Sequence, residues 1–240
     1  MVEQLTLGLV VAAALADSIN PCVFGVLIFL LAYMTAVFKS KARMLLAGFV
    51  YVASVYVTYL LLGLGIFTLA YTSGLAQPFY FFAAFVAIIA GLFEIKDYFW
   101  YGKGFSLQMI PGASQRIKRL SEIMKRMEVK HPILAIGVAV ILGIFVVLVE
   151  LPCTGAPYLA IIGMLSSGDY SSGIPLLLLY NLIFILPLFV IIFLVYMGHT
   201  SKKLEAWRKE HRGLMRLGIG LFLLALGGYM LWSVLKGSLF

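Results

Sequence analysis

The chain has only two cysteines, Cys22 and Cys153, and each directly follows a proline. The local sequences are Asn20-Pro21-Cys22 and Leu151-Pro152-Cys153-Thr154-Gly155-Ala156-Pro157. Thiols can exchange with disulfides, a reaction in which a thiolate attacks a sulfur atom and electrons pass between the partners. A lone cysteine in an apolar segment is more often a small apolar residue. Two such sites, about half a chain apart, favour a chemical role.

The first site carries the pattern of a helix start. Asparagine is a favourable N-cap, and proline is favoured at the first helical position. We therefore expect Asn20 to cap a new half-helix, with Pro21 as its first residue and Cys22 as its second. The free amides at a helix N-terminus form its positive end, which would favour the thiolate of Cys22.

The second site has two prolines, Pro152 and Pro157, five positions apart. An unwound turn is expected between them, and Gly155 would permit backbone shapes that other residues resist. Exposed backbone is costly in hydrocarbon, so both Pro-Cys breaks should be buried in protein or line a cavity.

Two acids lie near the cysteines in sequence: Asp17 five residues before Cys22, and Glu150 three before Cys153. An acid at membrane depth is expensive and is functional by default. Either acid could take the proton when a thiol ionises. Alternatively they lie near the membrane interface, or they bond backbone amides freed at the breaks. The bonding role is favoured for Asp17, and the role of Glu150 stays open.

The elements that must position these residues are membrane helices. The 240 residues are 63% hydrophobic and only 12% charged, which indicates an integral membrane protein. Six apolar segments are long enough to span a bilayer, which takes about 20 residues each. They cover about residues 5–38, 44–71, 79–99, 132–165, 173–197 and 213–235. The first and fourth are too long for one straight span, and they are expected to break at Pro-Cys.

The distribution of basic residues orients these spans. Lysine and arginine gather in the connections after the first, third and fifth segments, up to Arg216, whereas the other two connections carry only Asp169. Because basic loops stay in the cytoplasm, both termini are expected outside the cell membrane. Glu94 is expected at the interface near Lys96 and Asp97. The net charge of +8 gives no indication of nucleic acid binding.

The longest connection, about 101–131, has its own helical pattern. Ile117, Leu120, Met124 and Met127 recur at helical spacing among basic residues. This predicts a short amphipathic helix, lying either on the lipid headgroups of the cytoplasmic leaflet or in solvent as a linker. A docking surface for an acidic cytosolic partner is a third interpretation.

The two halves also suggest a repeat within a single polytopic domain. Repeat one would cover about 1–100 and repeat two about 132–240, each with three spans beginning at a Pro-Cys helix. Because three spans reverse the direction of entry, a shared fold would form an inverted 3+3 repeat. Such repeats place a common site near the bilayer midplane and can open it to either side.

The pattern as a whole resembles the CcdA family, relatives of the membrane domain of the DsbD reductases. The resemblance rests on six spans, on Asn-Pro-Cys in the first and on Pro-Cys-Thr-Gly-x-Pro-Tyr at 152–158 in the fourth. It covers essentially the whole chain.

This resemblance implies a thiol–disulfide oxidoreductase of the prokaryotic cell membrane. Its redox pair would be Cys22 and Cys153. Electrons would come from cytosolic thioredoxin and pass to an extracytoplasmic thioredoxin-like protein, commonly one that serves cytochrome c maturation. No cofactor or metal is implied. The residues that shape the exposure of the pair would be Asn20, Pro21, Pro152, Thr154, Gly155 and Pro157. Neither site is a Cys-x-x-Cys, so a mixed disulfide at one cysteine would be resolved by the other.

Two other functions compete with this one. An inverted-repeat exporter of small solutes or ions could use Asp17, Glu150 and the broken helices, and its cysteines would be incidental. A quinone-linked thiol oxidase would normally need a Cys-x-x-Cys pair, which the sequence lacks.

Overall fold

A computed structural model describes residues 2–20, 22–23, 40–100, 113–130, 132–168, 170–197 and 201–236. Within these ranges the chain is helical and contains no β-strand. The helices are α1 (Val2–Ser18), α3 (Lys41–Thr72), α4 (Ala76–Phe99), α5 (Ala113–Lys130), α6 (Pro132–Ser166), α7 (Tyr170–Tyr196) and α8 (Ser201–Leu235).

Four of these helices, α3, α4, α7 and α8, are long and apolar enough to cross a membrane. The fifth candidate is α6, which bends by 82° between Ile136–Leu151 and Thr154–Ser166. The chain is therefore an all-helical, multi-pass membrane protein with four or five candidate spans in its described part. Most of the predicted first span after Cys22, residues 24–38, lies outside the described residues.

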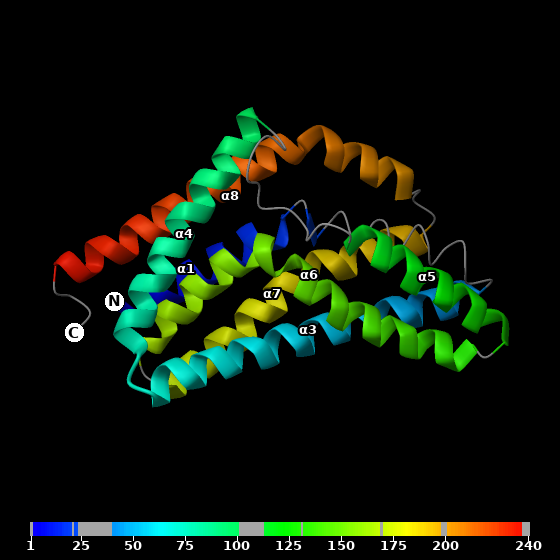
Figure 1. The fold of residues 1–240 in the computed structure, drawn as a ribbon, viewed down its shortest axis with the longest axis horizontal. Coiled ribbons are helices and arrows are strands. Elements are labelled where there is room, and N and C mark those ends of the chain that lie inside the picture. Colours follow the sequence, from blue (N-terminus) through cyan, green and yellow to red (C-terminus); the bar gives the residue numbers. More distant parts are fainter. Residues whose placement is uncertain are drawn as a thin grey trace.

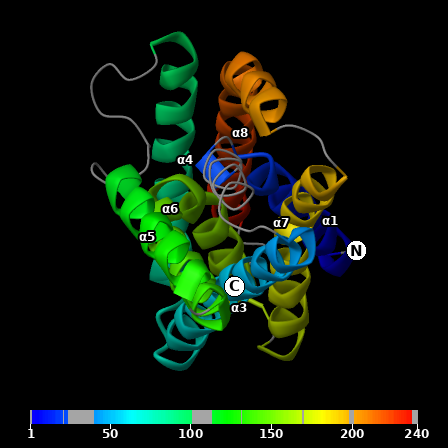
Figure 2. The ribbon, with the colours of Figure 1, turned by 90° about the vertical axis from the view of Figure 1, so that its right-hand side faces the viewer.

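The helices pack as two connected groups (Figures 1 and 2). α4 and α8 cross as a pair, whereas α3 packs against both α6 and α7. α1, drawn in blue, contacts both α7 and α8, and α6 contacts both α3 and α4. The breaks in α6 and after α1 therefore lie where the two groups meet.

The predicted amphipathic helix is confirmed as α5, but its apolar face is used differently. Ile117 is 2% exposed and belongs to the main apolar core, and α5 contacts α6. A leaflet-bound or solvated helix would have left Ile117 on the protein surface, so neither interpretation fits this residue. The side chains of Met124 and Met127 lie outside the description.

α8 begins about twelve residues earlier than predicted, at Ser201 instead of near Gly213. The basic residues assigned to a connection therefore lie on a helix. Lysine, arginine and glutamate are good helix formers, and an ion pair joins Glu205 to Lys209 one turn later at 2.8 Å. Arg216, expected near the cytoplasmic surface, is instead 2% exposed.

Candidate functional site

The first Pro-Cys site forms the predicted helix cap. α1 ends at Ser18, and the backbone N–H of Cys22 donates to the side-chain Oδ1 of Asn20 at 3.0 Å. This is the bond that an N-cap makes with the second residue of a helix. Asn20 is buried and Cys22 is half-buried. Pro21 lies outside the described residues.

The second Pro-Cys site differs from its prediction. The bend of α6 falls between Leu151 and Thr154, and the chain is helical again from Thr154 through Ser166. The predicted unwound turn between Pro152 and Pro157 is therefore wrong. A proline is tolerated within the first turn after a bend because amides there have few carbonyl partners. The side chains of Pro152 and Cys153 lie outside the description.

Gly155 does not adopt the special backbone shape that its position suggested. Its φ is negative, and Gly74 is the glycine with positive φ in the described part of the chain. Its neighbour Thr154 is fully buried and bonds the Glu150 carbonyl at 3.2 Å, which links the helix across the bend.

The two acids predicted near the cysteines are both buried in the protein interior. Asp17 is 1% and Glu150 is 2% exposed. Cys22 and Asp17 are both close enough to Glu150 to interact with its carboxyl electrostatically. The turn that carries Cys22 therefore approaches the part of α6 that precedes Cys153.

The carboxyl of Asp17 is held by another helix. Its Oδ2 accepts a hydrogen bond from the Tyr180 hydroxyl of α7 at 2.9 Å. The predicted bonds from this carboxyl to freed backbone amides are not among those that the described residues form. Asn20 instead donates its backbone N–H to the backbone carbonyl of Asp17, at 3.0 Å.

A cluster of hydroxyl groups joins α3, α6 and α7 beside these acids. The hydroxyl of Tyr59 lies 2.5 Å from Thr154 Oγ1, and Tyr158 donates to the Tyr59 carbonyl at 2.8 Å. Asn181 donates to the Tyr158 hydroxyl at 3.1 Å, and the Tyr158 and Tyr180 rings lie 5.2 Å apart. The sequence signal for this cluster is a set of polar groups inside apolar segments, although their pairing could not be inferred.

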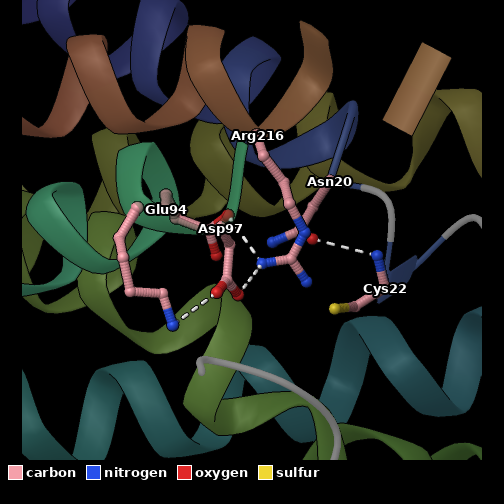
Figure 3. A network of polar contacts seen from close by, with 6 residues as sticks. Asn20, Cys22, Glu94, Asp97 and Arg216 are labelled. Carbon is pink, nitrogen blue, oxygen red and sulfur yellow. Dashed lines mark hydrogen bonds and ion pairs between the residues drawn. The ribbon is translucent and has the colours of Figure 1, made fainter. Parts of the chain in front are cut away.

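A buried ion cluster joins α4 to α8 and was not predicted. The Arg216 guanidinium lies 2.6 Å from Asp97 and 3.2 Å from Glu94, and Lys96 pairs with Asp97 at 2.7 Å. Glu94 is 4% exposed, and it lies near Asp97 and Lys96 as predicted. Figure 3 shows the guanidinium between these acids and the Asn20–Cys22 turn. The available signal was an arginine that enters an apolar run.

This arrangement can support sulfur chemistry. A thiol lies within electrostatic range of two buried carboxyl groups, and a buried cation points toward the same turn. No group of three or more histidine, cysteine or acidic side chains that could hold a metal occurs among the described residues. Comparison with protein-family models, curated proteins and solved structures gave no match.

Proposed function

We propose that the chain is a thiol–disulfide conduit of the CcdA type. It would pass reducing equivalents from cytosolic thioredoxin through Cys22 and Cys153 to an extracytoplasmic thioredoxin-like protein that serves cytochrome c maturation. The observation that carries this proposal is the proximity of Cys22 to Glu150. Because Glu150 precedes Cys153 by three residues, this proximity supports one site built from both halves.

The proposed reaction is a pair of thiol–disulfide exchanges. A thioredoxin thiolate attacks the Cys22–Cys153 disulfide and releases one of the two as a thiolate. The second thioredoxin thiol then resolves the mixed disulfide, so that thioredoxin is oxidised and the pair is reduced by two electrons. On the outer face, a thiolate of the reduced pair attacks a disulfide of the acceptor protein. The second cysteine of the pair then resolves the mixed disulfide, so that the pair is oxidised and the acceptor is reduced.

Each exchange also requires proton transfer, because the attacking sulfur must be a thiolate and the released sulfur takes up a proton. Glu150 and Asp17 are suited to hold and return this proton, since both lie near Cys22 and are shielded from solvent. The Tyr180 hydroxyl, bonded to Asp17, would orient one of the two carboxyls.

The helix contacts support the inverted repeat that this mechanism uses. We pair α1 with α6, α3 with α7, and α4 with α8 as corresponding elements of the two halves. Exchanging the halves converts the α1–α7 contact into α6–α3, and the α1–α8 contact into α6–α4. Both members of each exchange are present, as expected for two halves related by approximate two-fold symmetry. The full proposal has six spans, with both termini outside a prokaryotic cell membrane.

Thiol trapping in membranes tests the conduit. Oxidised membranes should contain an intramolecular Cys22–Cys153 disulfide, visible as protection of both thiols from a maleimide. Reduced thioredoxin on the cytoplasmic side should open it, and Cys22→Ser or Cys153→Ser should abolish both the disulfide and electron transfer. If the two sulfurs never link under oxidising conditions, the proposal fails.

The competing exporter draws support from the same acids. Asp17 and Glu150 are buried and close together, as a midplane site for a cation would require. The cysteine variants distinguish the exporter from the conduit. An exporter would keep full solute transport in Cys22→Ser and lose it in Glu150→Gln, whereas the conduit would stop in Cys22→Ser.

A further inference from the structure

Arg216 is a cation held inside the helix bundle. Only 2% of its surface is exposed, and its guanidinium contacts Asp97 at 2.6 Å and Glu94 at 3.2 Å. A buried charge is costly unless partners of opposite sign hold it in good geometry. The two acids of α4 therefore fix both the position and the charge of this group.

The fixed guanidinium is directed at the first Pro-Cys turn. α8 contacts α1, and Figure 3 shows the Arg216 side chain extending toward Asn20 and Cys22. Asn20 in turn accepts the backbone N–H of Cys22 at 3.0 Å. The ion cluster therefore faces the capped cysteine where α8 meets α1.

The charged groups around Cys22 determine how a nearby guanidinium would affect its thiol. The charged and titratable groups that face this region are Asp17 of α1, Tyr51 of α3, Glu94, Lys96 and Asp97 of α4, Glu150 of α6, Tyr180 of α7 and Arg216 of α8. The carboxylates of Asp17 and Glu150 would repel a thiolate, because like charges disfavour each other in a poorly solvated interior. A cation directed at the same turn offsets that repulsion.

We propose that Arg216 is a positioning residue for thiol exchange: its guanidinium stabilises the thiolate of Cys22, and Glu94 and Asp97 hold it in place. The inference rests on the proposed function, because it assigns Cys22 as an exchanging thiol. It extends that function by naming a group on α8 that would favour ionisation of the thiol.

The two-cysteine composition allows a direct test. In a Cys153→Ser background, the rate of Cys22 alkylation by iodoacetamide is measured against pH in the full-length protein. Arg216→Gln should move the midpoint of the profile upward by about one pH unit, a loss of about tenfold in rate at pH 7. The rate at high pH, where the thiol is fully ionised, should stay unchanged. Arg216→Lys keeps the charge and should shift the midpoint less.

The controls separate charge from packing. In the same Cys153→Ser background, Lys209→Gln removes an exposed base from the same helix and should leave the Cys22 midpoint unchanged. If Arg216→Gln does not fold, the double variant Asp97→Asn/Arg216→Gln removes one ion pair and leaves Glu94 and Lys96. It should still move the Cys22 midpoint upward, by less than about one pH unit, because the cation directed at the turn is lost. An unchanged Cys22 midpoint, or equal shifts for the Lys and Gln variants, would overturn the inference. Because alkylation needs no electron transfer, failure here is distinct from failure of the disulfide experiment.

Discussion

Several of the buried side chains in the described part of this protein are acidic. Asp17, Glu94, Asp97 and Glu150 are all buried, although an acid is expensive inside a membrane protein. Glu94 and Asp97 have a cation between them, whereas Asp17 and Glu150 are gathered around a thiol and tyrosine hydroxyls. Cations balance the first pair, whereas the second pair would hold protons in the proposed function.

Removing the Tyr180 hydroxyl should lower the stability of the protein. Tyr180→Phe deletes the donor to Asp17 Oδ2 and leaves a buried carboxyl oxygen without that bond. The free energy of unfolding in detergent should fall by about 1–3 kcal/mol. Tyr196→Phe, on the same helix but 38% exposed, is the matched control and should change it by less than about 0.5 kcal/mol. Equal effects from both substitutions would contradict a specific role for the Tyr180 hydroxyl.

At the scale of helices, the α4–α8 crossing depends on three glycines, Gly91, Gly220 and Gly227. A Cβ added at Gly220 would lie 2.9 Å from the Gly91 carbonyl oxygen and 2.7 Å from Ile95 Cγ1. The backbones can approach this closely only because neither position carries a side chain. The close crossing also places α8 where Arg216 can meet Glu94 and Asp97.

Two alanine substitutions one half-turn apart test this dependence. Gly220→Ala should force the helices apart and lower the free energy of unfolding by about 1–3 kcal/mol. Gly218→Ala has no atom within 4 Å of the new Cβ and should stabilise the protein by up to about 1 kcal/mol through helix propensity. Steric trapping or denaturant titration would measure both. Destabilisation by Gly218→Ala of the same size would argue against close packing as the cause.

The features that were predictable from sequence are local in the chain. The Asn20 cap follows from three adjacent residues, and α5 follows from a periodicity within 18 residues. The Arg216 cluster joins residues more than a hundred positions apart, and the packing of α4 on α8 decides it. Nothing in the sequence distinguishes Gly218 from Gly220, whereas the rotation of α8 places Gly220, and not Gly218, against α4.

The position of the bend in α6 likewise could not be predicted from the sequence alone. Two prolines predict that the helix is disturbed, but they do not decide which one bends it. The 82° change of direction falls at Pro152–Cys153, and Pro157 lies inside the resumed helix. The contact of Thr154 with Tyr59 favours this choice, and it exists only once α3 has packed on α6.

For the molecule as a whole, orientation in the membrane depends on where the charges lie. α5 exposes four bases on its surface, Arg116, Lys118, Arg119 and Arg126, whereas the turn between α3 and α4, residues 73–75, carries no charge. Basic segments are retained in the cytoplasm, so these two regions should face opposite sides of the bilayer. The proposed conduit requires this, since its electron donor and its acceptor are in different compartments.

Single-cysteine labelling in a Cys22→Ser/Cys153→Ser background tests that orientation. Ser73 lies in the exposed turn between α3 and α4, and Gln115 is exposed on α5. In intact cells, a membrane-impermeant maleimide should label Ser73→Cys and should reach Gln115→Cys only after permeabilisation. The reverse pattern would place the termini in the cytoplasm and would contradict the proposed direction of electron flow. Labelling of both without permeabilisation would contradict the assignment of the two regions to opposite sides. Because both variants keep the same helices and the same cysteine-free background, the difference between them reports topology alone.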